Sequence, residues 1–385
     1  MDGFGAANIT GKSAASMVAT PSAASSPITP GEREYPMVID FLNRNLRPTS
    51  KWSIVDEYPT SLSKSQMHNM RVIIENGQIV SHAAFRPMIV KTPIGVFKVA
   101  GIGSVVTSPD HRGQGHSTQI IDACLEAAAA ADCDFAILWT DLFDFYRRMD
   151  FELAGSEVTV ILDREVGPKA GWKFLDSSKV APDTLIRVFQ QHSVSSHRSQ
   201  EDVRLMLAIP NSTVMTAWDP NGRLAAYAVV GKGADLDGYI HEWGGSVSAL
   251  MGLFSHLRTA LNRDLRLIAP AHATGILSKL KDAGCIDHRG YLGMVRILKS
   301  ESMFSKIKRH ARAIGISDLV LEEDGGRFKF GHQDQVYTTE SKRDLVQLLF
   351  GPEKPSQMGK FDPTTAKILD RVLPIPLWIW GWDSV

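Results

Sequence analysis

The chain has 385 residues, more than one ordinary domain requires, so two or three domains are expected. Hydrophobic residues make up 44% and charged residues 22%, and the formal net charge is zero, so no global field would attract nucleic acid or an anionic membrane. No apolar run approaches the roughly twenty residues that cross a bilayer. The three cysteines have no CxxC spacing, which argues against a disulfide framework or a zinc site and favours the reducing cytoplasm.

The N-terminal half is expected to begin with a disordered arm, because residues 1–32 are rich in Ala, Ser, Thr and Pro and lack the features of a signal peptide. A first domain is predicted over residues 33–166. Its expected elements are a helix at 38–46, a hairpin of strands 70–75 and 78–86 around Asn76-Gly77, a strand at 96–107 and a closing strand at 156–163. Gly101 and Gly103 interrupt the strand at 96–107 and indicate a bulge or a close backbone approach.

A basic, glycine-rich loop follows that strand and opens a helix over residues 119–131. Free N–H groups and the positive end of the helix dipole make such a helix start a phosphate site, and small residues let the backbone approach the phosphate. The predicted cofactor-binding residues are Val105, Val106, Thr107, Arg112, Gly113, Gln114, Gly115, His116, Ser117 and Thr118.

Three classes of phosphate-bearing cofactor are bound by this arrangement. For two of them, the chain lacks a residue that the binding motif requires. A P-loop needs lysine after its last glycine, where His116 stands, and a dinucleotide fingerprint needs a third glycine, where Thr118 stands. The remaining class is coenzyme A. The order strand, Arg-Gly-Gln-Gly, helix resembles the pyrophosphate loop of the GNAT acetyltransferase superfamily, with Arg112, Gly115 and Ser117 on its key positions.

A second motif lies beyond the helix. A buried strand is predicted at 135–140, followed by Phe145-Tyr146-Arg147-Arg148-Met149-Asp150-Phe151-Glu152. This segment resembles the GNAT motif in which a helix brings a tyrosine to the thiol end of coenzyme A. Asp150 stands where the motif has glycine, and aspartate tolerates the left-handed backbone better than most residues.

The second half of the chain repeats the plan of the first without the Arg-Gly-Gln-Gly loop, so residues 167–300 are predicted to form a degenerate GNAT-like domain. Residues 301–385 are predicted as a third, small α/β domain. The chain reaches Val385 through an apolar, aromatic stretch, residues 373–382, which must dock somewhere. The expected fold class is therefore α/β (α+β), with tandem GNAT-like mixed sheets flanked by helices and a small C-terminal α/β domain.

This architecture resembles the Eis-type (enhanced intracellular survival) family of acetyltransferases, whose third domain is similar to a sterol carrier protein. The resemblance implies that Tyr146 is the general acid and that the carboxylate of Val385 enters the active site as general base. Residues 101–104 of the strand before the loop offer no carboxylate, which favours that base. Asp141 is the alternative base, although it could equally cap the helix that carries Tyr146.

The sequence thus predicts a cytoplasmic enzyme that transfers an acetyl group directly from acetyl-CoA to an amine, without a metal. The acceptor stays open among an amino sugar, a polyamine, a lysine or a peptide amine. Nucleic acid and membrane are not expected partners, and a homo-oligomer is compatible with the sequence. The alternative function is a non-catalytic protein that binds acyl-CoA or a lipid.

Overall fold

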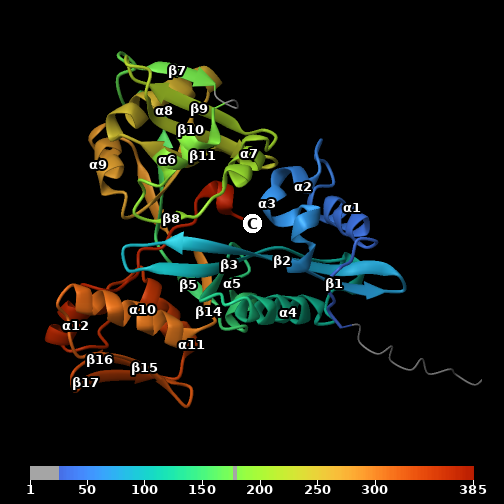
Figure 1. Cartoon of the computed structure of the whole chain (residues 1–385), viewed down its shortest axis with the longest axis vertical. Coiled ribbons are helices and arrows are strands. Elements are labelled where there is room, and N and C mark those ends of the chain that lie inside the picture. The colour runs from blue at the N-terminus through green and yellow to red at the C-terminus, as the bar shows by residue number, and fades with distance from the viewer. Residues whose placement is uncertain (1–25, 177–179) are drawn as a thin grey trace, which may run out of the picture.

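A computed structural model describes residues 26–176 and 180–385 of the chain. It contains three β-sheets with helices packed on them (Figure 1), which confirms the expected α/β class with two mixed sheets and a small third one. No helix among the described residues has the length and apolarity that a membrane span requires. Of the predicted arm, residues 1–25 lie outside the described part, while Ile28 bridges to Val72.

The first sheet has the strand order β1-β2-β3-β4-β14-β5, and the two-residue strand β8 pairs with β2. Its strands are β1 (Met70–Glu75), β2 (Gln78–Lys91), β3 (Val96–Thr107), β4 (Phe135–Leu138), β14 (Gly293–Ile297), β5 (Glu152–Ala154) and β8 (Ser195–Ser196). The predicted hairpin is confirmed, because β1 and β2 pair antiparallel around Asn76 and Gly77, both with positive φ.

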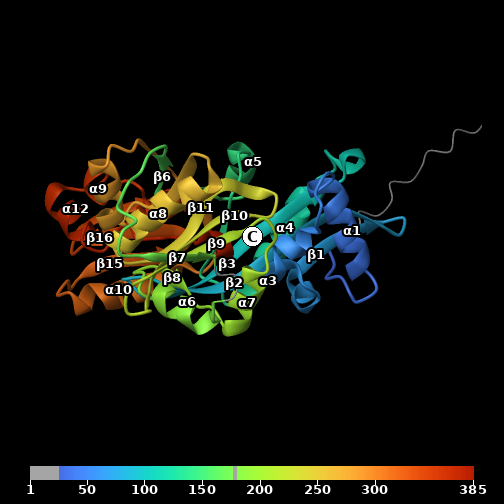
Figure 2. The same cartoon turned by 90° about the horizontal axis from the view of Figure 1, so that it is seen from above.

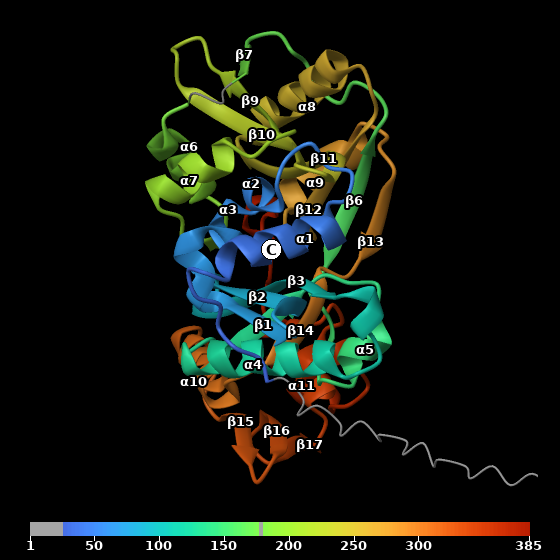
Figure 3. The ribbon, with the colours of Figure 1, turned by 90° about the vertical axis from the view of Figure 1, so that its right-hand side faces the viewer.

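Helices cover both faces of this sheet (Figure 3). One face carries α4 (His116–Ala130), whose buried side chains include Ile120, Ile121 and Cys124. The other carries α1 (Tyr35–Leu46), α2 (Ile54–Glu57) and α3 (Pro59–Leu62), followed by the 3₁₀ turn η1 (Lys64–Asn69). A further 3₁₀ turn, η2 (Pro109–His111), precedes α4, and the short helix α5 (Phe143–Arg147) follows β4.

Strand β3 is irregular where it approaches the loop. His82 of β2 pairs with Val106 and Ala84 with Gly103, so residues 104 and 105 lie opposite one residue of β2. Ser104 has a φ of 51°, as the extra residue of a bulge can have. On the other edge, β3 pairs with β4 only from Val99 to Gly101. Beyond that point the two strands no longer pair, which leaves the edge of β3 open.

The second sheet has the order β13-β6-β12-β11-β10-β9-β7. Its strands are β6 (Glu157–Leu162), β7 (Lys173–Asp176), β9 (Thr213–Trp218), β10 (Leu224–Lys232), β11 (Asp235–Gly245), β12 (Leu265–Pro270) and β13 (Asp287–Gly290). Its helices are α6 (Pro182–Phe189), α7 (Gln200–Leu207), α8 (Val247–Leu261) and α9 (Thr274–Asp282). Figure 2, from above, shows α8 beside β10 and β11.

Two strands are exchanged between the sheets, which corrects one expectation. The strand predicted to close the first domain, residues 156–163, lies in the second sheet as β6, between β12 and β13. In return β14 lies in the first sheet between β4 and β5. Apolar alternation identifies a strand but not its partner, so the sequence could not reveal the exchange. The division at residues 166 and 300 stays a prediction, and the exchanged strands cross it.

The third sheet is an antiparallel meander of β15 (Leu319–Asp324), β16 (Arg327–His332) and β17 (Gln335–Thr339). Helices α10 (Ser300–Ala313), α11 (Lys342–Phe350) and α12 (Pro363–Leu369) accompany it, with the 3₁₀ turn η3 (Pro355–Gln357). From there residues 373–385 run as a tail to the centre of the molecule (Figure 1), ending in the 3₁₀ turn η4 (Gly381–Asp383). Most of the tail is buried, as its aromatic composition predicts, while residues 384 and 385 are half-buried.

Candidate functional site

The loop before α4 has the geometry of an anion site. Gly113 has a φ of 79° and Gly115, the N-cap residue of α4, a φ of 83°, values that side chains disfavour. Among the described residues, no acceptor takes a hydrogen bond from the backbone N–H groups of residues 113–118. Those N–H groups and the positive end of the helix dipole are therefore available to a phosphate.

Side chains anchor this loop on the sheet. The hydroxyl of Thr107 lies 2.8 Å from that of Ser81 and 2.9 Å from that of Ser117, which ties the first turn of α4 to β2 and β3. His116 Nε2 lies 3.2 Å from a carboxylate oxygen of Glu75, and only 4% of His116 is exposed. His116 therefore offers a phosphate its backbone N–H and not its ring, whereas the exposed Arg112 can supply a charge from outside.

A cavity of about 290 Å³ opens where β3 leaves β4. It brings together Tyr146 from α5, Val105 from β3 and Val385 from the tail, three of the predicted site residues. Asp141 does not line this cavity and is exposed. Of the two predicted bases, only Val385 lines this cavity together with Tyr146.

Tyr146 is held by packing, while its hydroxyl has no hydrogen-bond partner among the described residues. Its ring meets Phe145 and Phe151 edge-on, with centroid distances of 4.9 and 5.8 Å. Burial raises the pKa of Tyr146 to about 12, so the phenol stays protonated at neutral pH. Asp150 has a φ of 62°, so it takes the left-handed conformation at the position where the motif has glycine.

The end of the tail lies against the bulged part of β3, where the two glycines make room for it. A Cβ on Gly103 would lie 2.6 Å from the carboxyl carbon of Val385, and one on Gly101 3.0 Å from its side chain. The bulge itself is fixed by His82, whose Nδ1 donates to the Ser104 carbonyl at 2.8 Å. Burial lowers the pKa of His82 to about 4, so this imidazole is neutral.

A buried ionic network, which the sequence did not predict, fixes the tail at Asp383, two residues before Val385. Asp383 is fully buried, and its Oδ2 accepts from Arg198 Nη2 at 2.6 Å and from the Ser196 hydroxyl at 2.5 Å. Arg198 also pairs with Glu242 at 2.8 Å, and Arg86 donates to the Asp383 carbonyl at 3.2 Å. A charge inside an apolar tail requires a cationic partner, so Asp383 alone could have indicated such a network, though not its members.

Glu242 is paired with Arg198, so its role is structural and not that of an acid or base. The sequence contains His241-Glu242-Trp243, which looks like an acid–base pair. His241 instead donates to the Gly231 carbonyl at 2.9 Å and packs on Gly381 of the tail. Burial lowers its pKa to about 3. Both side chains support the tail and do not line the cavity.

Lys232 at the end of β10 holds the last turn of the tail. Its ammonium donates to the carbonyls of Gly381 and Ser384 at 2.9 and 2.8 Å and to the Ser384 hydroxyl at 2.9 Å. Burial, and secondarily the charge of Arg86, lowers its pKa to about 7. The peptide just before Val385 is thus held by a lysine that titrates near neutrality.

Stability should therefore depend on pH through Lys232. Between about pH 7 and pH 10 the unfolded chain binds a proton at this lysine that the folded protein does not, so the free energy of unfolding rises with pH there. Lys232→Met removes this dependence. Urea titrations at pH 7, 8 and 9 measure the free energy of unfolding of both proteins. The difference between the unsubstituted protein and the variant should rise by on the order of 1 kcal/mol per pH unit. A constant difference would contradict a lowered pKa of Lys232.

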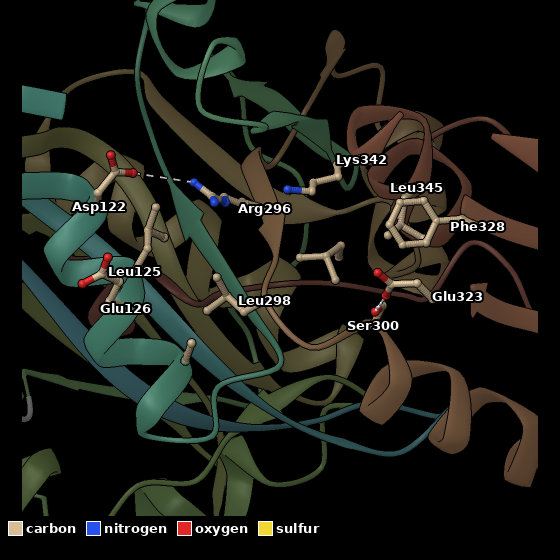
Figure 4. Close-up of a pocket in the computed structure, with 12 residues that line it drawn as sticks. Asp122, Leu125, Glu126, Arg296, Leu298, Ser300, Glu323, Phe328, Lys342 and Leu345 are labelled. Carbon is tan, nitrogen blue, oxygen red and sulfur yellow. Dashed lines mark hydrogen bonds and ion pairs between the residues drawn. The ribbon is translucent and has the colours of Figure 1, made fainter. Parts of the chain in front are cut away.

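A separate cavity of about 380 Å³ lies between α4, β14 and the elements α10, α11, β15 and β16 (Figure 4). Acidic and basic side chains line it, with Asp122 and Glu126 on α4 and Arg296 and Lys342 across from them. Arg296 and Asp122 approach each other at 3.9 Å, which partly neutralises the wall. None of the predicted site residues lines this cavity.

Comparison with known proteins agrees with the geometry. Residues 32–154 match a family model described as an acetyltransferase (GNAT) domain. A search of curated proteins finds no relative by sequence.

Solved structures share the fold over nearly the whole length at low identity. A probable N-acyltransferase from Enterococcus faecalis superposes with a TM-score of 0.64 at 15% identity, covering 92% of this chain and 97% of the other. A GCN5-related N-acetyltransferase from Anabaena variabilis gives 0.63 at 14%, covering 94% and 100%. Eis1 from Mycobacterium abscessus gives 0.59 at 13%, covering 94% and 98%. At this identity the likeness is one of fold.

Proposed function

We propose that this protein is an acetyl-CoA-dependent N-acetyltransferase that transfers the acetyl group directly to an amine. The observation that carries the proposal is the cavity where β3 leaves β4. Tyr146, whose hydroxyl has no hydrogen-bond partner among the described residues, and Val385 both line this cavity, and β3 leads from it to the loop before α4, where N–H groups are free. The GNAT match of residues 32–154 covers Tyr146 and the loop, but not Val385.

Coenzyme A would lie along the open edge of β3, with its pyrophosphate on the loop. The N–H groups of residues 113–118 would donate to the phosphates, and Arg112 would add a cation at the surface. The pantetheine arm would follow β3 past residues 105–107 toward the cavity, where the thioester would meet the N–H groups of the bulged strand. Such donors stabilise the oxygen on which negative charge develops.

The transfer would then need one proton to leave the amine and one to reach the sulfur. We propose that the carboxylate of Val385 takes the proton from the attacking amine. The new C–N bond forms as the C–S bond breaks, and the departing thiolate takes a proton from the Tyr146 hydroxyl. Holding both reactants in one cavity supplies a large share of the rate.

Replacing Gly115 by valine should weaken acetyl-CoA binding about tenfold or more. The φ of 83° at this N-cap excludes a β-branched residue, so the loop must move and its N–H groups would no longer converge. Isothermal titration calorimetry measures the affinity. Gly222→Val is the matched control, because that glycine has a φ of 75°, has no atom within 4 Å of a Cβ, and lies in the turn between β9 and β10, away from the loop. Equal affinities for the two variants would overturn the cofactor site.

Release of free coenzyme A thiol from acetyl-CoA in the presence of amines tests the reaction itself. Turnover that requires both acetyl-CoA and an amine supports the transferase. Tight acetyl-CoA binding without thiol release from any amine would instead favour a non-catalytic acyl-CoA-binding protein.

A further inference from the structure

Strand β13 forms an open edge of the second sheet. Among the described strands it pairs only with β6, and all of its residues are exposed. Figure 3 shows β13 along the outer margin of the molecule. An unpaired edge presents a row of N–H and C=O groups that can pair with a further strand. The edge of β13 is therefore a surface to which another chain can add a strand.

The pairing with β6 shows which residues of β13 face outward. The carbonyl of Ile286 accepts from the N–H of Ile161 at 2.9 Å, so the backbone groups of Ile286 face β6. These groups alternate in direction along a strand, so those of Asp287 and Arg289 face away from β6. Neither backbone forms a hydrogen bond with another element of the described chain. Asp287 and Arg289 each offer an N–H and a C=O to a new strand.

The two outward-facing residues carry opposite charges. Side chains that are two residues apart in a strand lie on the same face, and Arg289 Nε approaches Asp287 Oδ2 at 3.9 Å. Both side chains are accessible, since 39% of Asp287 and 74% of Arg289 is exposed. An edge with one acid and one base is complementary in charge to an antiparallel copy of itself, because reversal of the strand brings each charge opposite the other.

Charge then selects the register in which two copies of β13 can pair. Outward-facing residues must lie opposite one another to exchange both hydrogen bonds. The arrangements within the strand are Asp287 opposite Asp287, Arg289 opposite Arg289, or Asp287 opposite Arg289. The first two place like charges face to face, which destabilises paired strands. The last pairs opposite charges on both sides of a twofold axis and places His288 opposite His288 on that axis.

The same register brings an exposed apolar side chain to an open space, because Ile286 lies opposite Gly290 of the second copy. Ile286 is 56% exposed, which is unusual for a large apolar residue. A Cβ on Gly290 would meet no atom within 4 Å, so the space over this glycine is empty of other described residues. The isoleucine of each copy would fill that space on the other, and its apolar surface would leave water.

We infer that β13 is an interaction surface for a second copy of this chain. The two strands pair antiparallel about a twofold axis at His288, so that the second sheets of the two copies join into one. The partner is the same chain because its own strand carries the complementary charges at the required spacing. The inference concerns assembly and does not depend on the proposed acetyl transfer.

Exchange of the two charges tests the register. Asp287→Arg and Arg289→Asp each place like charges opposite one another, so the dissociation constant of the dimer should rise about tenfold or more in either variant. The double variant Asp287→Arg/Arg289→Asp should restore it to within about threefold. Arg263→Asp, in an exposed ion pair with Asp237 elsewhere in the same sheet, is the matched control and should change nothing. Sedimentation of the full-length chain at several concentrations measures the dimer, and thermal melting checks each fold.

A cysteine on the axis provides an independent test. Opposite residues that exchange no hydrogen bonds have closely spaced Cβ atoms, as a disulfide requires. Under mild oxidation His288→Cys should give a disulfide-linked dimer. Thr338→Cys, on the exposed edge strand β17, should not, and neither should the unsubstituted protein, in which the cysteines are buried.

A monomer at every concentration would overturn the inference. A dimer with the same dissociation constant in all charge variants would place the contact elsewhere and overturn it as well. Equal cross-linking through His288→Cys and Thr338→Cys would show random collision and not a defined axis.

Discussion

Tyr146→Phe should lower kcat for acetyl transfer by about a hundredfold or more, while KM for acetyl-CoA changes little. The substitution removes one oxygen and leaves the ring in its edge-on contacts with Phe145 and Phe151. No hydrogen bond within the described residues is lost with it, so the fold should be unaffected. Positioned acids and bases typically contribute a factor of that size. Steady-state kinetics with an amine that is turned over measures the effect.

Tyr291→Phe is the control for this variant. That tyrosine is 47% exposed and lines a different cavity, beside the base of the tail, so removal of its hydroxyl should leave kcat unchanged. Because burial raises the pKa of Tyr146 to about 12, its deprotonation should produce no loss of activity between pH 6 and 9. A loss of threefold or less in the Tyr146 variant would assign this residue to packing alone.

Most local elements of this fold can be read from the sequence, because they depend on neighbouring residues. Asn76-Gly77 predicts its hairpin, and the strand at 96–107 has the predicted bounds. Strand β17 was missed because its residues, Gln335–Thr339, are mostly exposed and do not show the alternation of a half-buried strand. The alternation of apolar and polar residues thus reveals a strand only if one of its faces is buried.

The residues of the site likewise fall into those that the sequence reveals and those that only the fold brings together. Tyr146 and the loop belong to contiguous motifs, so their chemistry is visible in the sequence. Arg198, Glu242 and Asp383 are far apart in the chain, and only the folded tail brings them together. The exchange of β6 and β14 couples the two large sheets, and the tail runs to them from α12, beside the third sheet. A pattern within one element carries no information on such pairings.

The tail is held in place by many contacts with the described residues. Trp378, Trp380 and Trp382 are each 1% exposed, and the carboxylate of Asp383 is bonded on both oxygens. Lys232 then fixes the Ser384 carbonyl. An apolar plug would not need polar anchors at Asp383 and Ser384, the two residues directly before Val385. Such anchors set the position of Val385, as the proposed catalytic carboxylate would require.

Conversion of the Val385 carboxylate to a carboxamide should therefore abolish most turnover. The amide has almost the same size and shape, but cannot accept the proton of the attacking amine, so kcat should fall about a hundredfold or more. Acetyl-CoA affinity and the thermal midpoint should be preserved, because the tryptophans, Asp383 and the contact with Lys232 are unchanged. Semisynthesis by peptide ligation supplies the amide, and the ligated product with a free carboxylate is its matched control.

Addition of two glycines after Val385 provides an independent version of the same change, since it moves the negative charge away from the bulge of β3 while all anchors of the tail remain. The amide and the extended protein should both bind acetyl-CoA with normal affinity and release little thiol.

Full activity in the amide would remove Val385 from the mechanism. The base would then have to be Asp141, exposed outside the cavity, or a water molecule, and Asp141→Asn would decide between those two by its effect on kcat. Loss of activity in the amide but not in the matched ligated control would leave the carboxylate as the base, because nothing else differs between the two proteins.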